Sequence, residues 1–214
     1  MLKSQSVSYP RTFLRRFSSL QKDIDLILEQ IRFEAFVGIH LGAGGVEIPG
    51  LINSDLYNTT VGEKLNAINL RGFKDASIDL IETHHMIEHL SFAEFEIALK
   101  EWFRVLRPEG YLIISCPDIT SVSARWLWLA IKNKFVPCAD ERLYTLKMIY
   151  GSQEHNGMFH KSGYDKSHLK MLLEKWGFIV KFAYSPYPKR RTPSLLVIAK
   201  KYKVSEYPEG GDNE

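Results

Sequence analysis

Apolar and polar positions along the chain follow two periods, one typical of buried strands and one typical of amphipathic helices. The strand-like segments are short apolar runs at 36–41, 51–56, 65–70, 78–81, 111–115, 178–184 and 195–200. The helix-like segments repeat apolar residues every three or four positions, at 12–33, 91–106, 122–133, 141–150 and 165–176. Strands that alternate with helices predict an α/β fold around a mainly parallel sheet.

The segment from Ser77 to Asp118 contains two of these strands with a helix between them. Its first apolar run ends at the polar residues 82–85, and Ser91 then lies three residues before Glu94, the spacing of a capping box. In a parallel sheet, ligands bind at the carboxyl ends of the strands. The polar strand ends therefore predict a binding site as well as a fold.

The connection between the first two strands is unusually short. Gly42 ends the first strand, and Pro49-Gly50 leads directly into the second at Leu51. A parallel crossover normally takes a dozen or more residues and contains a helix. We therefore expect the helix here to be a single turn or absent.

Composition narrows the class of protein. The 214 residues fit one domain, and 45% hydrophobic with 25% charged residues is ordinary for a globular chain. A net charge of +3 does not favour nucleic acid as a partner. No apolar run has the length of a membrane span, and the first residues lack the apolar core of a secretory signal, so we expect a cytoplasmic location. Two cysteines do not make a disulfide framework.

Glycines and a carboxylate follow the first two strands. Gly42-Ala43-Gly44 comes directly after the first strand, where glycine lets a ligand approach the backbone. Asp55 ends the second, where a carboxylate can accept both hydroxyls of a ribose. A tight turn would explain these glycines alone, and a surface turn would explain Asp55. On these residues alone, a nucleoside-binding site and a pair of ordinary turns both stay open as interpretations.

With these residues, five segments of the chain resemble the class I, Rossmann-like superfamily of S-adenosylmethionine-dependent methyltransferases. More narrowly, they resemble its small type 11-like members. The resemblance covers roughly residues 36 to 200, and each segment is a loose motif that gains weight from its order and spacing. The segments are VGIHLGAGG, INSDL, SIDLIETHHMIEHL, RVLRPEGYLIISCPD and LLEKWGF.

The resemblance implies a particular fold and division of the chain. It implies a three-layer sandwich whose mainly parallel sheet has seven strands, one of them antiparallel, with the first helix abbreviated. The methyltransferase domain would span 36–202 and contain a helical and loop insertion at about 120–164. An N-terminal helical extension, 1–35, would precede it and a polar tail, 203–214, would follow.

The resemblance also implies where S-adenosylmethionine binds. Gly42 and Gly44 would pass under its methionine part, and Asp55 would hold its ribose. His40 stands where the family usually has an acidic residue, and Asn66 stands where it often has Asp. The implied cofactor-binding residues are His40, Gly42, Ala43, Gly44, Asp55, Leu56, Asn66, Ala67, Thr83 and His84.

Histidines near the strand ends are the candidate bases for methyl transfer. His85 is the first candidate and His160 the second, because imidazole titrates near neutral pH. Asp118 is the third candidate. His85 and His89 could share a helix face as metal ligands do, but the sequence is not His-Glu-x-x-His. We therefore expect no metal site.

The expected function is methyl transfer to a small-molecule or glycan acceptor, by O- or N-methylation, and the glycan part rests on the resemblance alone. The rival is a non-catalytic binding or scaffold protein on a degenerate methyltransferase fold, because fold does not fix function. A nicotinamide-dependent oxidoreductase is disfavoured, since Glu47 occupies the third glycine position of Gly-x-Gly-x-x-Gly. The sequence does not indicate an oligomeric state.

Overall fold

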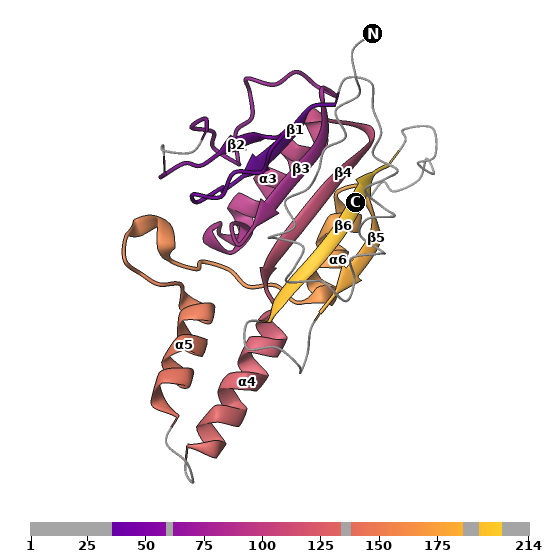
Figure 1. Ribbon diagram of the computed structural model, residues 1–214. Helices are drawn as coiled ribbons and strands as arrows, with labels where there is room; N and C mark the ends of the chain where they lie inside the picture. Colours follow the sequence, from indigo (N-terminus) through magenta and orange to yellow (C-terminus); the bar gives the residue numbers. More distant parts are fainter. Residues whose placement is uncertain (1–35, 59–61, 134–137, 186–192, 203–214) are drawn as a thin grey trace.

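The computed structural model describes residues 36–58, 62–133, 138–185 and 193–202 (Figure 1). The helix predicted at 12–33 and the polar tail lie outside these residues. None of the described helices combines the length and the apolar character that crossing a membrane requires.

One six-stranded sheet organises the described part of the chain, in the order β2-β1-β3-β4-β6-β5. β6 pairs antiparallel with both β4 and β5, and the other ladders are parallel, which confirms a mainly parallel sheet with an antiparallel part. The strands are β1 (Gly38–Leu41), β2 (Ile52–Ser54), β3 (Ile78–His84), β4 (Leu106–Pro117), β5 (Phe178–Tyr184) and β6 (Ser194–Lys201).

The prediction of a seventh strand at 65–70 is wrong for the described residues. This segment turns on itself: the Asn69 N–H donates to the Asn66 carbonyl at 2.9 Å, and the Ile68 N–H donates to Asn66 Oδ1 at 3.1 Å. An asparagine side chain that bonds the backbone two residues on stabilises a turn in competition with a ladder. The Trp102 indole N–H then holds the turn by donating to the Ala67 carbonyl at 2.9 Å.

Two helices cover one face of the sheet. α3 (Phe92–Val105) and α6 (Lys166–Lys175) bury their apolar sides in the larger core cluster, together with inward residues of β1, β3, β4 and β6. The opposite face carries a smaller cluster centred on Leu80 and Ile113. The described residues therefore show two of the three predicted layers, the sheet and one layer of helices.

The remaining helices extend from the carboxyl edge of the sheet (Figure 1). α4 (Ile119–Lys132) and α5 (Ala139–Tyr150) pack against each other, and short 3₁₀ turns η2 (Ile87–His89) and η3 (Asn156–Met158) lie in the loops. The predicted capping box is confirmed, since Ser91 Oγ accepts from the Glu94 N–H and the Glu94 carboxylate accepts from the Ser91 N–H. Turns, not a helix, join β1 to β2, as predicted.

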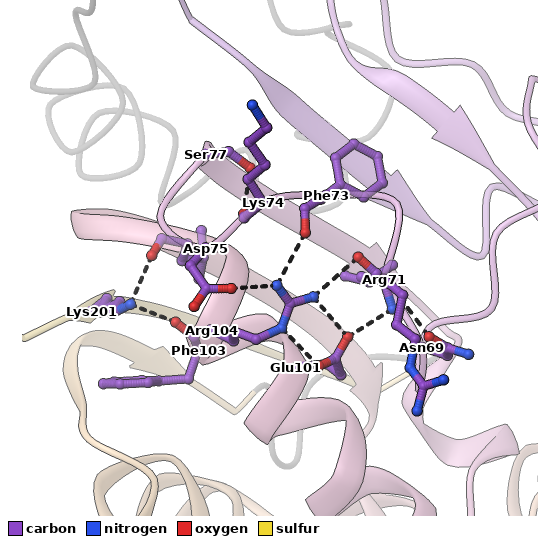
Figure 2. A network of polar contacts seen from close by, with 12 residues as sticks. Asn69, Arg71, Phe73, Lys74, Asp75, Ser77, Glu101, Phe103, Arg104 and Lys201 are labelled. Atoms are coloured by element: carbon purple, nitrogen blue, oxygen red, sulfur yellow. Dashed lines mark hydrogen bonds and ion pairs between the residues drawn. The ribbon is translucent and has the colours of Figure 1, made fainter.

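An arginine network fixes the loop that stands in place of the seventh strand (Figure 2). The Arg104 guanidinium donates to the carbonyls of Leu70 and Phe73 at 3.1 and 3.0 Å, and to the Asp75 carboxylate at 2.6 Å. Glu101 bonds both Arg104 and the Leu70 N–H, at 2.9 Å each. These hydrogen bonds satisfy backbone groups that a ladder would otherwise satisfy.

Candidate cofactor and acceptor site

Asp55 fastens the glycine loop to the end of β2. Its carboxylate accepts hydrogen bonds from the backbone N–H groups of Gly44 at 2.8 Å, Tyr57 at 2.8 Å and Asn58 at 2.7 Å. The Asn58 side chain closes the loop from the other side by donating to the Gly44 carbonyl at 2.8 Å. A carboxylate offers about four acceptor sites, so about one stays available for a ligand hydroxyl.

The two glycines of the loop have different surroundings. Both have positive φ, +73° at Gly42 and +62° at Gly44, a region that glycine occupies without strain. A Cβ on Gly42 would lie 2.3 Å from Met86 Cγ, whereas a Cβ on Gly44 would meet nothing within 4 Å. Packing against Met86 therefore explains Gly42, and Gly44 is the position where a ligand can approach the backbone.

A buried polar cluster lies where β1 and β3 pair. His40 is the register partner of Glu82, and His84 bonds Glu82 Oε1 through Nε2. His40 Nδ1 lies 3.1 Å from Asn53 Oδ1, an acceptor, so Nδ1 carries the hydrogen and Nε2 carries the lone pair. Burial, followed by repulsion from His84, lowers the pKa of His40 and keeps this ring neutral at neutral pH.

Two atoms of this cluster are buried without a hydrogen bond among the residues that the structure describes, His40 Nε2 and Glu82 Oε2. Thr83 Oγ1, on the same strand end, is a third such atom. Buried polar atoms cost free energy unless they are hydrogen-bonded. Their grouping at one strand end indicates a place for a polar ligand.

His85 follows β3 in a strained conformation. Its φ is +51°, and its N–H donates to the Ser115 carbonyl at 2.7 Å. The ring is held on two sides, with Nε2 3.0 Å from Ser194 Oγ and Nδ1 3.3 Å from Glu88 Oε1. A non-glycine residue at positive φ costs of order 1 kcal/mol and is often found at functional sites.

The irregular segment 151–163 crosses the same edge of the sheet. The Lys161 N–H donates to the Glu88 carbonyl at 2.8 Å, which places the segment beside η2. Near its other end, the Tyr57 and His155 rings lie 6.0 Å apart. The segment therefore runs between α5 and α6 past both the glycine-loop side and the His85 side of the site.

The other predicted residues have local structural contacts. Asp118 is the N-cap of α4 and is buried; it accepts from the Ser121 hydroxyl at 2.8 Å and from the Ser185 hydroxyl. Asn66 and Ala67 form the turn described above, and Leu56 is partly exposed beyond β2. Burial lowers the pKa of His160, whose Nδ1 lies 3.1 Å from the Met148 carbonyl oxygen. These contacts are structural, so the roles predicted for these residues in cofactor binding and catalysis stay predictions.

Sequence reasoning passed over Glu82 as a site residue, and it weighed Glu88 and His89 as metal ligands but set them aside. Glu82 could have been found, because a charged residue at the end of a buried strand needs a partner. Glu88 and His89 were set aside because the spacing of 85–89 is not His-Glu-x-x-His, and because their partner His160 lies in a segment that periodicity does not place.

Comparison with known proteins shows which proteins the chain resembles. A model of the methyltransferase domain family matches residues 52–114. No curated protein sequence matches the chain. Solved methyltransferase structures are similar in fold, and at 15–18% identity they show the fold alone.

Three of these structures cover most of the chain. A Methanosarcina mazei methyltransferase is 18% identical with a TM-score of 0.54, and the match covers 82% of this chain and 97% of that one. An Archaeoglobus fulgidus methyltransferase is 17% identical with a TM-score of 0.52, covering 86% and 92%. The 1,6-didemethyltoxoflavin-N1-methyltransferase of Burkholderia thailandensis, solved with its substrate and S-adenosylhomocysteine, is 15% identical with a TM-score of 0.53, covering 78% and 71%.

The family match covers less than half of the chain, and the solved structures extend the likeness to the whole fold. Over residues 52–114 the chain is similar to the methyltransferase domain family, and its fold is that of the S-adenosylmethionine-dependent methyltransferases.

Proposed function

We propose that this protein binds S-adenosylmethionine along the carboxyl ends of β1, β2 and β3, and transfers its methyl group to a small-molecule or glycan acceptor. The observation that carries the proposal is the open approach to Gly44, with Asp55 on one side and the unsatisfied Glu82 on the other. The neighbour from B. thailandensis, which contains S-adenosylhomocysteine and 1,6-didemethyltoxoflavin, supports this class of cofactor and acceptor.

The fit to the cofactor is best at its methionine end. The family's usual acidic residue is replaced by His40, but Glu82 lies beside it in the β1–β3 ladder and has a buried oxygen without a hydrogen bond in the described chain. An ammonium group needs acceptors, and Glu82 Oε2 and His40 Nε2 supply two. The pair thus offers what the missing acidic residue would have provided.

The ribose and adenine would lie further along the same edge. Asp55 keeps an acceptor site for one hydroxyl, while its other bonds hold the loop that the cofactor crosses. Leu56, Ala67 and Asn66 follow on that side and would flank the adenine. Backbone groups of the 65–70 turn would hydrogen-bond the edge of the adenine, because Asn66 Oδ1 already accepts a hydrogen bond within the turn.

A bound sulfonium supplies an already activated methyl group, so the protein's task is to align an acceptor and remove its proton. His85 is the first candidate for that proton. The Glu88 carboxylate lies beside His85 Nδ1 and favours a hydrogen on that atom. His85 Nε2, which lies 3.0 Å from Ser194 Oγ, is then the basic nitrogen. His160 and Asp118 remain the second and third candidates, the latter with its carboxylate engaged in a helix cap.

Calorimetry of the full-length protein with S-adenosylmethionine and S-adenosylhomocysteine tests the first half of the proposal. We expect both to bind with one site per chain. No binding of either would contradict the proposal and favour a scaffold protein on a methyltransferase fold. S-adenosylhomocysteine release, measured over panels of hydroxylated heterocycles, amines and saccharides, then tests the transfer.

A further inference from the structure

A second polar cluster lies next to the proposed acceptor side. Glu88 and His89 come from η2, and His160 comes from the segment 151–163. One metal-ligating atom from each of the three side chains lies within 4.8 Å of the others. Backbone hydrogen bonds explain why the two segments converge, since the Glu88 carbonyl accepts from the N–H groups of Lys161 and Ser162 at 2.8 and 3.2 Å.

The two imidazoles are held with one nitrogen free to bind an ion. His89 Nδ1 lies 3.1 Å from the Phe159 carbonyl oxygen, and His160 Nδ1 lies 3.1 Å from the Met148 carbonyl oxygen. A carbonyl only accepts, so each Nδ1 carries the hydrogen and each Nε2 carries the lone pair. Metal-binding histidines are typically oriented in this way, by donating the other ring N–H to a carbonyl or carboxylate.

The third side chain of the cluster, Glu88, has a buried carboxylate that lacks hydrogen bonds in the described part of the chain. The residue is 2% exposed, and neither carboxylate oxygen has a hydrogen bond in the described part of the chain. The ion-pair distance to His85 Nδ1, 3.3 Å, is the contact that the structure gives it. A buried carboxylate is costly unless it is paired or binds a metal ion, and the Nε2 lone pairs of His89 and His160 donate no hydrogen bond to it.

We propose that Glu88, His89 and His160 bind a divalent transition-metal ion, with Zn²⁺ the best match to the donors. Two imidazoles and one carboxylate are a donor set of catalytic zinc sites, whereas Mg²⁺ and Ca²⁺ prefer oxygen ligands. Bonds of about 2.0–2.2 Å set ligand atoms about 3–4 Å apart. The three side chains therefore have to close by about 1 Å around the ion.

This site goes beyond methyl transfer and does not depend on it. The sequence disfavoured a metal because residues 85–89 lack the His-Glu-x-x-His spacing, but the fold replaces the missing ligand with His160. Three protein ligands leave a coordination position open. Because Glu88 also contacts His85, an ion here would lie beside the candidate base and could receive an acceptor oxygen.

Metal binding can be measured without turnover. The full-length protein is stripped with a chelator and titrated with Co²⁺, followed by visible absorption, and with Zn²⁺, followed by calorimetry. We expect one ion per chain and the absorption of a four- or five-coordinate Co²⁺ site. We expect His160→Ala and Glu88→Gln to weaken Zn²⁺ binding by about 100-fold or more, and His155→Ala, in the same segment, to leave it unchanged.

Two results would overturn the proposal. One is the absence of Zn²⁺ and Co²⁺ binding by a folded protein, and the other is equal Zn²⁺ affinity in the wild type and the ligand variants. If Glu88→Gln unfolds, His89→Ala, at a half-buried position, replaces it in the comparison. Calorimetry with S-adenosylmethionine on the stripped protein separates failure of the metal site from failure of the cofactor site.

Discussion

His40 and Glu82 occupy paired positions of β1 and β3, and each keeps one buried polar atom without a hydrogen bond among the described residues. His40 is neutral, because burial lowers its pKa, so its Nε2 can accept but not donate. Neither atom can satisfy the other, since both are acceptors when Glu82 is ionised. The pair therefore matches a donor from outside the chain, and the ammonium group of S-adenosylmethionine is one.

Gly42 and Gly44 should respond differently to alanine. We expect Gly42→Ala to lower the free energy of unfolding by roughly 2–4 kcal/mol, because overpacking against Met86 adds to the strain of positive φ. Gly44→Ala carries only the strain, about 1 kcal/mol, and should instead weaken cofactor binding. Urea unfolding and cofactor calorimetry of both variants measure this; equal loss of stability would contradict the packing argument.

Glu101 should contribute to stability in a pH-dependent way. Its hydrogen bond from Arg104, followed by that from the Leu70 N–H, lowers its pKa in the folded protein. A lowered folded pKa means that the contribution is present above the unfolded pKa and is lost as pH falls through the folded one. Glu101→Gln should therefore cost about 1–2 kcal/mol at pH 7 and progressively less as the pH falls below the ordinary range of a carboxyl.

The control for this experiment is on the same helix. Glu96 pairs with Lys175 at the surface, so Glu96→Gln should change the free energy of unfolding by less than about 0.5 kcal/mol. Urea unfolding at several pH values gives both comparisons. A Glu101→Gln effect that does not depend on pH would rule out the ionised hydrogen bond as its origin.

Asp118 should behave as a helix cap. Asp118→Ala is expected to cost about 1–2 kcal/mol of stability, whereas Asp118→Asn, which can also cap, should cost much less. Asp165→Ala, at the N-cap of α6, is the matched variant. Turnover that collapses in a stable Asp118→Asn protein would instead show that the carboxylate acts on the acceptor.

His85 should separate turnover from cofactor binding. His85→Asn retains a residue type that tolerates positive φ. For a hydroxyl acceptor we expect kcat to fall by about 100-fold or more, the usual contribution of a general base, with an unchanged Kd for S-adenosylmethionine. Steady-state rates and calorimetry on the same preparation test this, and full turnover in the variant would exclude the role.

Local patterns predicted much of the fold. The strand at 178–184 and the capping box at Ser91 have the predicted bounds, because each depends on residues within one element. β4 is longer than the predicted 111–115, since 107–110, read as the end of a helix, begins the strand instead. The 65–70 run has strand-like composition, but the Asn66 side chain and Trp102 stabilise a turn.

The site was predicted less completely than the fold. Gly44 and Asp55 were identified because they follow strands directly, and the structure joins them by a hydrogen bond. The pairing of His40 with Glu82 depends on sheet register, which periodicity alone does not set. The approach of His160 to Glu88 depends on the path of an irregular segment, for which hydrophobic spacing gives no prediction.

We infer that Glu82 takes over the role of the missing acidic residue in binding S-adenosylmethionine. The most direct measurement is calorimetric titration of the cofactor into the wild type, Glu82→Gln and the exposed loop control Glu47→Gln. We predict that Glu82→Gln weakens binding by about tenfold or more, because a hydrogen bond to a charged group contributes about 1.5–3 kcal/mol, while Glu47→Gln binds as the wild type does. Equal affinities in all three proteins, each shown to be folded, would contradict the account.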